Sequence, residues 1–112
     1  MPEREDSVRL RHMLDHAREA VFLTQGKTRD DLETERLLNL GLVRLIEIVG
    51  EAATKVSGEM CSRHPEIPWT QIRGMRNRLI HGYDFVDFDI LWKTVTEELP
   101  PLIDALEKIV SQ

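Results

Sequence analysis

A run of apolar residues in the middle of the chain constrains the fold more than any other feature. It lies within a helix predicted from Asp30 or Asp31 to about Val56, and it leaves almost no side of that helix polar. Its members are Leu37, Leu38, Leu40, Leu42, Val43, Leu45, Ile46, Ile48 and Val49. A helix with so wide an apolar surface needs packing partners on more than one side. Those partners are either other helices of the same chain or a second copy of it, and the pattern slightly favours self-association.

The segments on either side of this helix carry their own signals. Residues 7–25 place apolar groups three or four positions apart, which is typical of an amphipathic helix. Ser7 is its predicted N-cap and Gly26 its predicted stop. Residues 57–68 contain one glycine and two prolines, and this composition predicts a loop.

The C-terminal half predicts three further helices. The first spans residues 69–81, and Gly82 after it suits the left-handed conformation that follows many helices. The second covers about residues 87–98, and the third begins at the proline pair 100–101, since proline is accepted in a first helical turn. No strand pattern or repeat interrupts this series. The sequence therefore predicts an all-α bundle of four or five helices in one domain, residues 1–112.

Charge and cysteine content narrow the classes of function. The net charge of −5 weighs against a protein that captures nucleic acid by general electrostatic attraction. A small basic site is still present within nine positions, made of Arg73, Arg76, Arg78 and His81. A single cysteine, Cys61, rules out an internal disulfide and indicates a reducing compartment. With no apolar run long enough to span a bilayer and no signal-peptide pattern, we expect a cytoplasmic protein without a membrane partner.

The basic site combines groups that could perform acid–base chemistry. On the predicted helix, Arg73, Asn77 and His81 are each four residues apart and would share one stripe. Arg76 and His81 are five apart, so their Cβ atoms point about 140° away from each other on a regular helix. The length of the arginine side chain, the helix end at Gly82 or pairing across a dimer axis could bring them together. Spacing alone does not decide among these routes.

The residue types suit metal-free RNA cleavage. His81 could move protons as a general acid or base, and the fixed positive charge of Arg76 could stabilise a phosphate in the transition state. Asn77 could orient either group or the scissile phosphate. In such a reaction the ribose 2′-OH attacks the neighbouring phosphate. The structural alternative is that arginine and histidine only stabilise the carbonyls at a helix C-terminus.

Other polar pairs have weaker claims. Glu47 and Glu51, one turn apart on the central helix, could hold Arg76 in position, although salt bridges on a solvated face are commoner. Two further pairs have spacing that zinc ligands also show, but each pair is isolated, so we expect surface residues rather than a metal site. They are His12 with His16, and Cys61 with His64. Trp69 and Trp92 are expected in the core. We predict no cofactor.

The segment Arg76-Asn77-x-x-x-His81-x-Tyr83 matches the motif of the HEPN superfamily, and the chain resembles the HepT toxin family in particular. The similarity includes residues 44–52 (RLIEIVGEA) and 69–77 (WTQIRGMRN). The resemblance implies a small all-α homodimer with the motif near the dimer interface. It also implies a metal-independent endoribonuclease, the toxin of a type VII-like toxin–antitoxin system.

The same resemblance implies specific roles for the motif. Arg76 and His81 match the catalytic pair, with Asn77 at the polar position, while Arg73, Arg78, Glu47 and Glu51 would support the site or bind RNA. A MntA-like minimal nucleotidyltransferase antitoxin would transfer AMP from ATP to Tyr83 and silence the toxin. An AMP chain two residues from His81 would place negative charge where an RNA phosphate binds. The alternative is a non-catalytic subunit that binds and regulates the nucleotidyltransferase, or a purely structural dimer.

Overall fold

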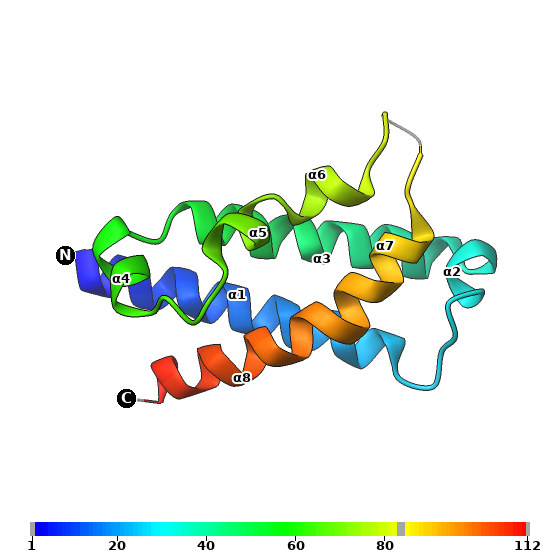
Figure 1. Cartoon of the computed structure of the whole chain (residues 1–112). Helices are drawn as coiled ribbons and strands as arrows, with labels where there is room; N and C mark the ends of the chain where they lie inside the picture. The colour runs from blue at the N-terminus through cyan, green and yellow to red at the C-terminus, as the bar shows by residue number, and fades with distance from the viewer. Residues whose placement is uncertain (1, 83–84, 112) are drawn as a thin grey trace.

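The computed structural model describes residues 2–82 and 85–111 of the chain, and these are almost entirely helical. Three long helices dominate (Figure 1): α1 (Pro2–Thr24), α3 (Arg36–Thr54) and α8 (Leu99–Val110). The shorter elements are α2 (Asp31–Thr34), α4 (Gly58–Arg63), α5 (Trp69–Arg73), α6 (Met75–Leu79), α7 (Phe88–Lys93) and the π-helix η1 (Thr94–Glu98). The predicted all-α class is confirmed. None of the described helices is both long and apolar enough to cross a membrane.

The core forms where α1 lies against α3 and α8 lies across α1 (Figure 1). Each helix contributes fully buried side chains at helical spacing, such as Met13 from α1, Ile46 from α3 and Leu106 from α8. Burying a side chain of this size stabilises the fold by about 1.5–3 kcal/mol relative to leaving it exposed. Trp69 is buried in the same core and Trp92 packs against it, as predicted.

The wide apolar surface of α3 is covered only in part. Other helices of the same chain bury Leu42, Ile46 and Val49. At the N-terminal end of α3, however, Leu37 remains 86% exposed and Leu40 remains 47% exposed. Neighbours within the chain therefore account for most of the apolar run, and its first turns present an apolar surface to solvent.

The predicted boundaries of the first two helices need correction. The first helix begins at Pro2, so Ser7 is not its N-cap, while Gly26 has a φ of 74° and ends it as predicted. The second helix is interrupted at Glu35, which separates α2 from α3. The buried Asn39 amide donates to the carbonyl of Leu32 at 2.8 Å and so holds α2 against α3. This contact across the break cannot be read from apolar periodicity.

The segment predicted as a loop, 57–68, contains the short helix α4. The Ser57 hydroxyl accepts a hydrogen bond from the backbone amide of Met60 at 3.1 Å and caps this helix. The buried carboxylate of Asp6 accepts hydrogen bonds from the backbone amide and the hydroxyl of Ser57, at 2.8 and 2.7 Å. The first turns of α1 therefore fix the start of α4, an interaction between residues distant in sequence.

The predicted third helix is divided at Gly74 and ends earlier than expected. Gly74 has φ −98° and ψ 5°, which breaks the helix into α5 and α6, and α6 ends at Leu79. Ile80 is extended and pairs with Val86 in an antiparallel bridge. His81 therefore lies beyond the helix, and the predicted stripe through Arg73, Asn77 and His81 is wrong.

A close approach between α3 and α5 sets the position of the basic segment. A Cβ atom added to Gly50 would lie 3.1 Å from the carbonyl oxygen of Ile72, which is a tight contact with the backbone of α5. Glycine at this position in α3 lets the α5 backbone lie directly on the helix. As a result, Arg73 and Arg76 lie above the polar side of α3.

The last two predicted helices form one continuous helical segment. The prolines 100–101 have no backbone N–H to donate, and each ring crowds the carbonyl four residues before it. These carbonyls, of Thr96 and Glu97, lie in the π-helical turn η1, whose wider hydrogen-bond ring accommodates the prolines. The prediction that the prolines separate two helices is therefore replaced by a local change in helix type.

Candidate functional site

Arg76 on α6 is held against α3 by Glu47. Its Nε lies 2.8 Å from Oε2 of Glu47, and Nη1 of Arg44 lies 2.5 Å from Oε1 of the same carboxylate. The hydrogen bond from Arg44 and the charges of both arginines hold the pKa of Glu47 below its ordinary value. The side chain of Arg76 remains 47% exposed, so part of its guanidinium group is available to a ligand. Glu47 therefore positions Arg76, as one of the two sequence interpretations proposed.

Glu47→Gln is expected to make the free energy of unfolding depend less on pH in the acidic range. Because the folded-state pKa of Glu47 lies below 4.5, its carboxylate stabilises the fold above that pH, and this contribution is lost as the pH falls through the lowered pKa. The variant should be less stable than wild type by about 0.5–1 kcal/mol near neutral pH, and the two should converge in acid. Urea unfolding as a function of pH, with Glu19→Gln as a surface control, measures this difference. A gap that stays constant with pH would contradict the assignment.

A shallow depression lies where α5 and α6 meet α3. It brings together five of the residues predicted for the site: Glu47, Glu51, Arg73, Arg76 and Asn77. Gly50 and Thr54 complete its lining. The Nη2 atom of Arg73 also donates to the sulfur of Cys61 at 3.2 Å, which links the depression to α4. Two carboxylates also line the depression, but Glu47 is held in ion pairs, and the guanidinium groups of Arg73 and Arg76 with the Asn77 amide are suited to bind an anion.

Arg78, also predicted to support the site, has a different environment. Its Nη2 donates to Oε1 of Glu98 at 3.1 Å and to the carbonyl oxygen of Gln71 at 3.4 Å. These contacts tie α6 to η1 rather than to α3, and Arg78 does not line the depression. The structure therefore separates it from Arg73, Arg76 and Asn77.

Residues 80–82 and 85–87 form the two antiparallel arms of a hairpin that projects from the helices (Figure 1). The backbone amide of His81 donates to the carbonyl of Phe85 at 2.8 Å, and the backbone amide of Asp87 donates to the carbonyl of Leu79 at 2.8 Å. The imidazole is exposed, and its centroid lies 5.9 Å from that of the Phe85 ring, which is 61% exposed. The predicted modification site, Tyr83, lies outside the described residues. His81 does not line the depression around Arg76.

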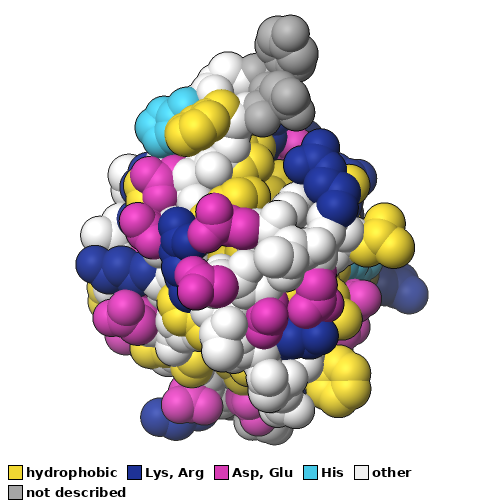
Figure 2. All heavy atoms as spheres, turned by 90° about the vertical axis from the view of Figure 1, so that its right-hand side faces the viewer, with side chains coloured by type: hydrophobic (Ala, Val, Ile, Leu, Met, Phe, Trp, Pro, Cys, Tyr) yellow, Lys and Arg dark blue, Asp and Glu magenta, His cyan; other side chains and the backbone are white. Residues whose placement is uncertain are grey.

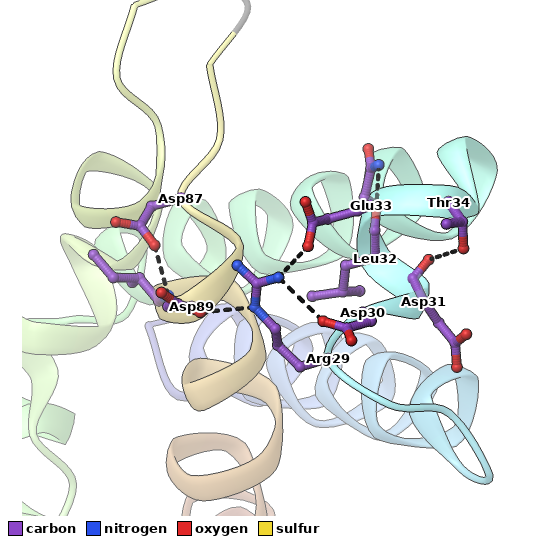
Figure 3. Close-up of polar contacts among 10 residues, drawn as sticks. Arg29, Asp30, Asp31, Leu32, Glu33, Thr34, Asp87 and Asp89 are labelled. Atoms are coloured by element: carbon purple, nitrogen blue, oxygen red, sulfur yellow. Dashed lines mark hydrogen bonds and ion pairs between the residues drawn. The ribbon is translucent and has the colours of Figure 1, made fainter.

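A cluster of charged residues anchors the second arm of this hairpin (Figure 3). Nε of Arg29 lies 2.7 Å from Oδ1 of Asp89 in α7, and Nη1 forms ion pairs with Asp30 and Glu33. The hydrogen bond with Asp89 raises the pKa of Arg29 above its ordinary value. Asp87 accepts a hydrogen bond from the amide of Ile90 and caps α7. These contacts fix the start of α7, where the second arm of the hairpin ends.

The same end of the molecule shows no large area of one charge. Acidic and basic side chains are interspersed on the face that carries α2 (Figure 2). Sequence reasoning did not find Arg29 or Phe85. No local signal could have paired Arg29 with Asp89, 60 residues later, whereas Phe85 could have been noted as an aromatic residue beside the motif.

The remaining polar candidates do not line the depression around Arg76. His12 and His16 are stacked edge to face on α1, with ring centroids 6.2 Å apart, and Nδ1 of His16 lies 2.6 Å from the carbonyl oxygen of His12. The carbonyl of His64 accepts a hydrogen bond from Nε1 of the buried Trp69 at 3.0 Å. Within the described parts of the chain, no three side chains of the types His, Cys, Asp and Glu are grouped so that they could hold a metal ion.

Comparison with known proteins gives consistent matches over nearly the whole chain. The family described as "Ribonuclease HepT-like" matches residues 12–109. A protein of Thermococcus cleftensis named "Probable ribonuclease HepT" is 37% identical over 86% of this chain and 91% of its own length. A protein of Caldanaerobacter subterraneus named as a "Putative RNase" is 32% identical over 92% of both chains. One of the same description from Methanocaldococcus jannaschii is 29% identical over 98% of this chain and 91% of its own. No solved structure gives a significant match.

Proposed function

The chain belongs to the HepT-like ribonuclease family, and from this premise we propose that it is a metal-independent endoribonuclease toxin acting in the cytoplasm as a single helical domain. The observation that carries the proposal is the placement of Arg76. Its guanidinium group is fixed by Glu47 beside Arg73 and Asn77 but stays partly exposed, and His81 follows on the adjoining hairpin. These are the groups that RNA cleavage without a metal requires.

In the proposed reaction, the ribose 2′-OH attacks the adjacent phosphorus. His81 either accepts the 2′ proton, while solvent supplies the proton of the departing 5′ oxygen, or donates that proton, while solvent accepts the 2′ proton. Arg76 stabilises the charge that develops on the phosphate oxygens, and Asn77 orients the phosphate by hydrogen bonding. The products are a 2′,3′-cyclic phosphate and a free 5′-OH, so no water molecule is consumed, and the proposed roles of Arg76, Asn77 and His81 require no metal ion.

The proposed active form is a homodimer. Leu37 and Leu40 present an exposed apolar surface at the start of α3, whose later turns carry Arg44 and Glu47. A second copy that covers this surface would bury the leucines, as apolar patches at dimer contacts do. It would also bring two sets of motif residues close together. This supplies the neighbouring group that His81 needs, because His81 does not line its own chain's depression.

We also propose that a MntA-like nucleotidyltransferase silences the enzyme by AMP transfer to Tyr83. His81 and Phe85, which flank this part of the sequence, are both exposed, and this favours access by a second protein. An added nucleotide in this segment would carry negative charge and bulk next to His81. It would repel the phosphate backbone of RNA and obstruct the site.

One pair of measurements tests both halves of the proposal. The purified chain should cleave single-stranded RNA in the presence of EDTA and leave 2′,3′-cyclic phosphate ends. After incubation with the partner and ATP, its intact mass should rise by whole AMP units, and Tyr83→Phe should abolish that rise. A chain that binds the partner tightly but cleaves no RNA would instead indicate the non-catalytic subunit.

A further inference from the structure

A second depression adjoins the one around Arg76 on the surface of α3. It lies between α1 and α3 and is lined by Arg9, His12, Ile48, Glu51, Ala52 and Lys55. Glu51 lines both depressions, so the two adjoin each other at this side chain on α3. His12, Glu51 and Lys55 are exposed, and Arg9 is half-buried.

The two depressions together concentrate positive charge on an acidic protein. Arg9 and Lys55 in the second depression extend the cationic surface of Arg73 and Arg76, while the chain as a whole has a net charge of −5. Two carboxylates, Glu47 and Glu51, oppose these four cations, and Glu47 already forms ion pairs with Arg44 and Arg76. A local field of this sign attracts a polyanion even when the net charge of the protein does not.

We propose that this surface is a track for the phosphate backbone of single-stranded RNA. Arg73 and Arg76 bind at or beside the scissile phosphate, and Arg9, His12 and Lys55 contact phosphates farther along the same strand. The inference rests on the proposed ribonuclease function and extends it by naming the form of the substrate. A strand that crosses both depressions neutralises several phosphates, so binding weakens as salt rises.

The residues that line the track also indicate that it does not recognise individual bases. Among the described residues that line the two depressions, the imidazole of His12 is the sole aromatic ring. Stacking on aromatic side chains is the usual way in which single-stranded bases are held. The track therefore contacts the sugar–phosphate backbone, and it contributes affinity for RNA length rather than for base sequence.

The test compares two variants that lose the same charge. Arg9→Gln/Lys55→Gln removes two cations from the track, whereas Lys93→Gln/Lys108→Gln removes two exposed cations from α7 and α8. In a His81→Ala background, the first variant should bind a 15-nucleotide single strand about tenfold more weakly. Its salt slope should fall by about 1.4, because each phosphate that is no longer neutralised lowers the slope by about 0.7. The control should stay within about twofold of the parent, because distant charges are screened.

The catalytic readout separates the track from the cleavage site. With His81 present, the Arg9/Lys55 variant should show a raised KM and unchanged kcat on the long RNA, and no change on a trinucleotide. Equal losses in both variants, or no loss in either, would overturn the track. So would polyglutamate that competes as well as RNA and loses affinity in the same variant, since that result describes a site for an acidic protein.

The proposed function can fail independently of the track. If the wild-type chain binds RNA through Arg9 and Lys55 but leaves it uncut, the track stands and the ribonuclease assignment fails. If the chain cuts RNA normally and the Arg9/Lys55 variant binds it with wild-type affinity, the track fails alone. Circular dichroism and thermal unfolding confirm that each variant is folded before these measurements are compared.

Discussion

His81→Ala is expected to lower the rate of RNA cleavage by about 10²–10⁴-fold, the usual contribution of a general acid or base. Arg76→Ala should lower it by about 10²–10³-fold, because a fixed charge that stabilises the transition state is removed. Both reductions should fall on kcat, since these groups act when charge develops during the reaction. Single-turnover cleavage of a labelled RNA strand measures the rates.

The structure makes these variants interpretable. The imidazole of His81 is exposed and lies near the ring of Phe85, so its removal should change stability by no more than about 0.5 kcal/mol. His16→Ala is the matched control, because it removes a histidine from α1 at a distance from the motif in sequence and should retain cleavage. Arg76→Lys keeps the charge but lacks the planar group that pairs with Glu47, so it should recover only part of the rate. Full cleavage by His81→Ala would remove the proposed mechanism.

The sequence predicted the helical class and the local segments of the site because both depend on short-range patterns. Apolar periodicity identified α1, α3 and α8, and Gly26, the predicted stop of the first helix, follows α1 with a positive φ. The division at Gly74 was missed because a glycine within a helical pattern is usually tolerated. Its cause is tertiary, since the backbone of α5 lies against Gly50 of α3.

The arrangement of the site was less predictable than its membership. The motif and the neighbouring segments indicated Arg73, Arg76, Asn77, Glu47 and Glu51, and the fold does gather these five around one depression. Two groups differed because of contacts that the sequence does not encode locally. Arg78 pairs with Glu98, and His81 follows the bridge between Ile80 and Val86, beyond the end of α6. The role of Tyr83 stays a prediction.

Because His81 does not line the depression that holds Arg76, the second large prediction is that one chain's Arg76 acts with the other chain's His81. In a dimer built this way, a mixed dimer of Arg76→Ala and His81→Ala chains has one site with both defects and one intact site. Equal mixing with subunit exchange makes about half of the dimers mixed, so about one quarter of wild-type activity should return, from two preparations that are each nearly inactive. If each chain instead completes its own site, every site in the mixture carries a defect and no activity returns.

The exposed leucines of α3 supply the control that ties this recovery to the dimer. Leu37→Glu/Leu40→Glu, introduced into both chains, replaces solvent-exposed side chains and should leave the fold of the bundle intact. Charged residues on the apolar surface should prevent association, because burying an unpaired carboxylate costs several kcal/mol. Analytical ultracentrifugation should then show monomers, and mixing should restore no cleavage. Monomers that cleave RNA at the wild-type rate would show that one chain suffices. Arg76 and His81 of the same chain would then have to come together through a movement of the hairpin.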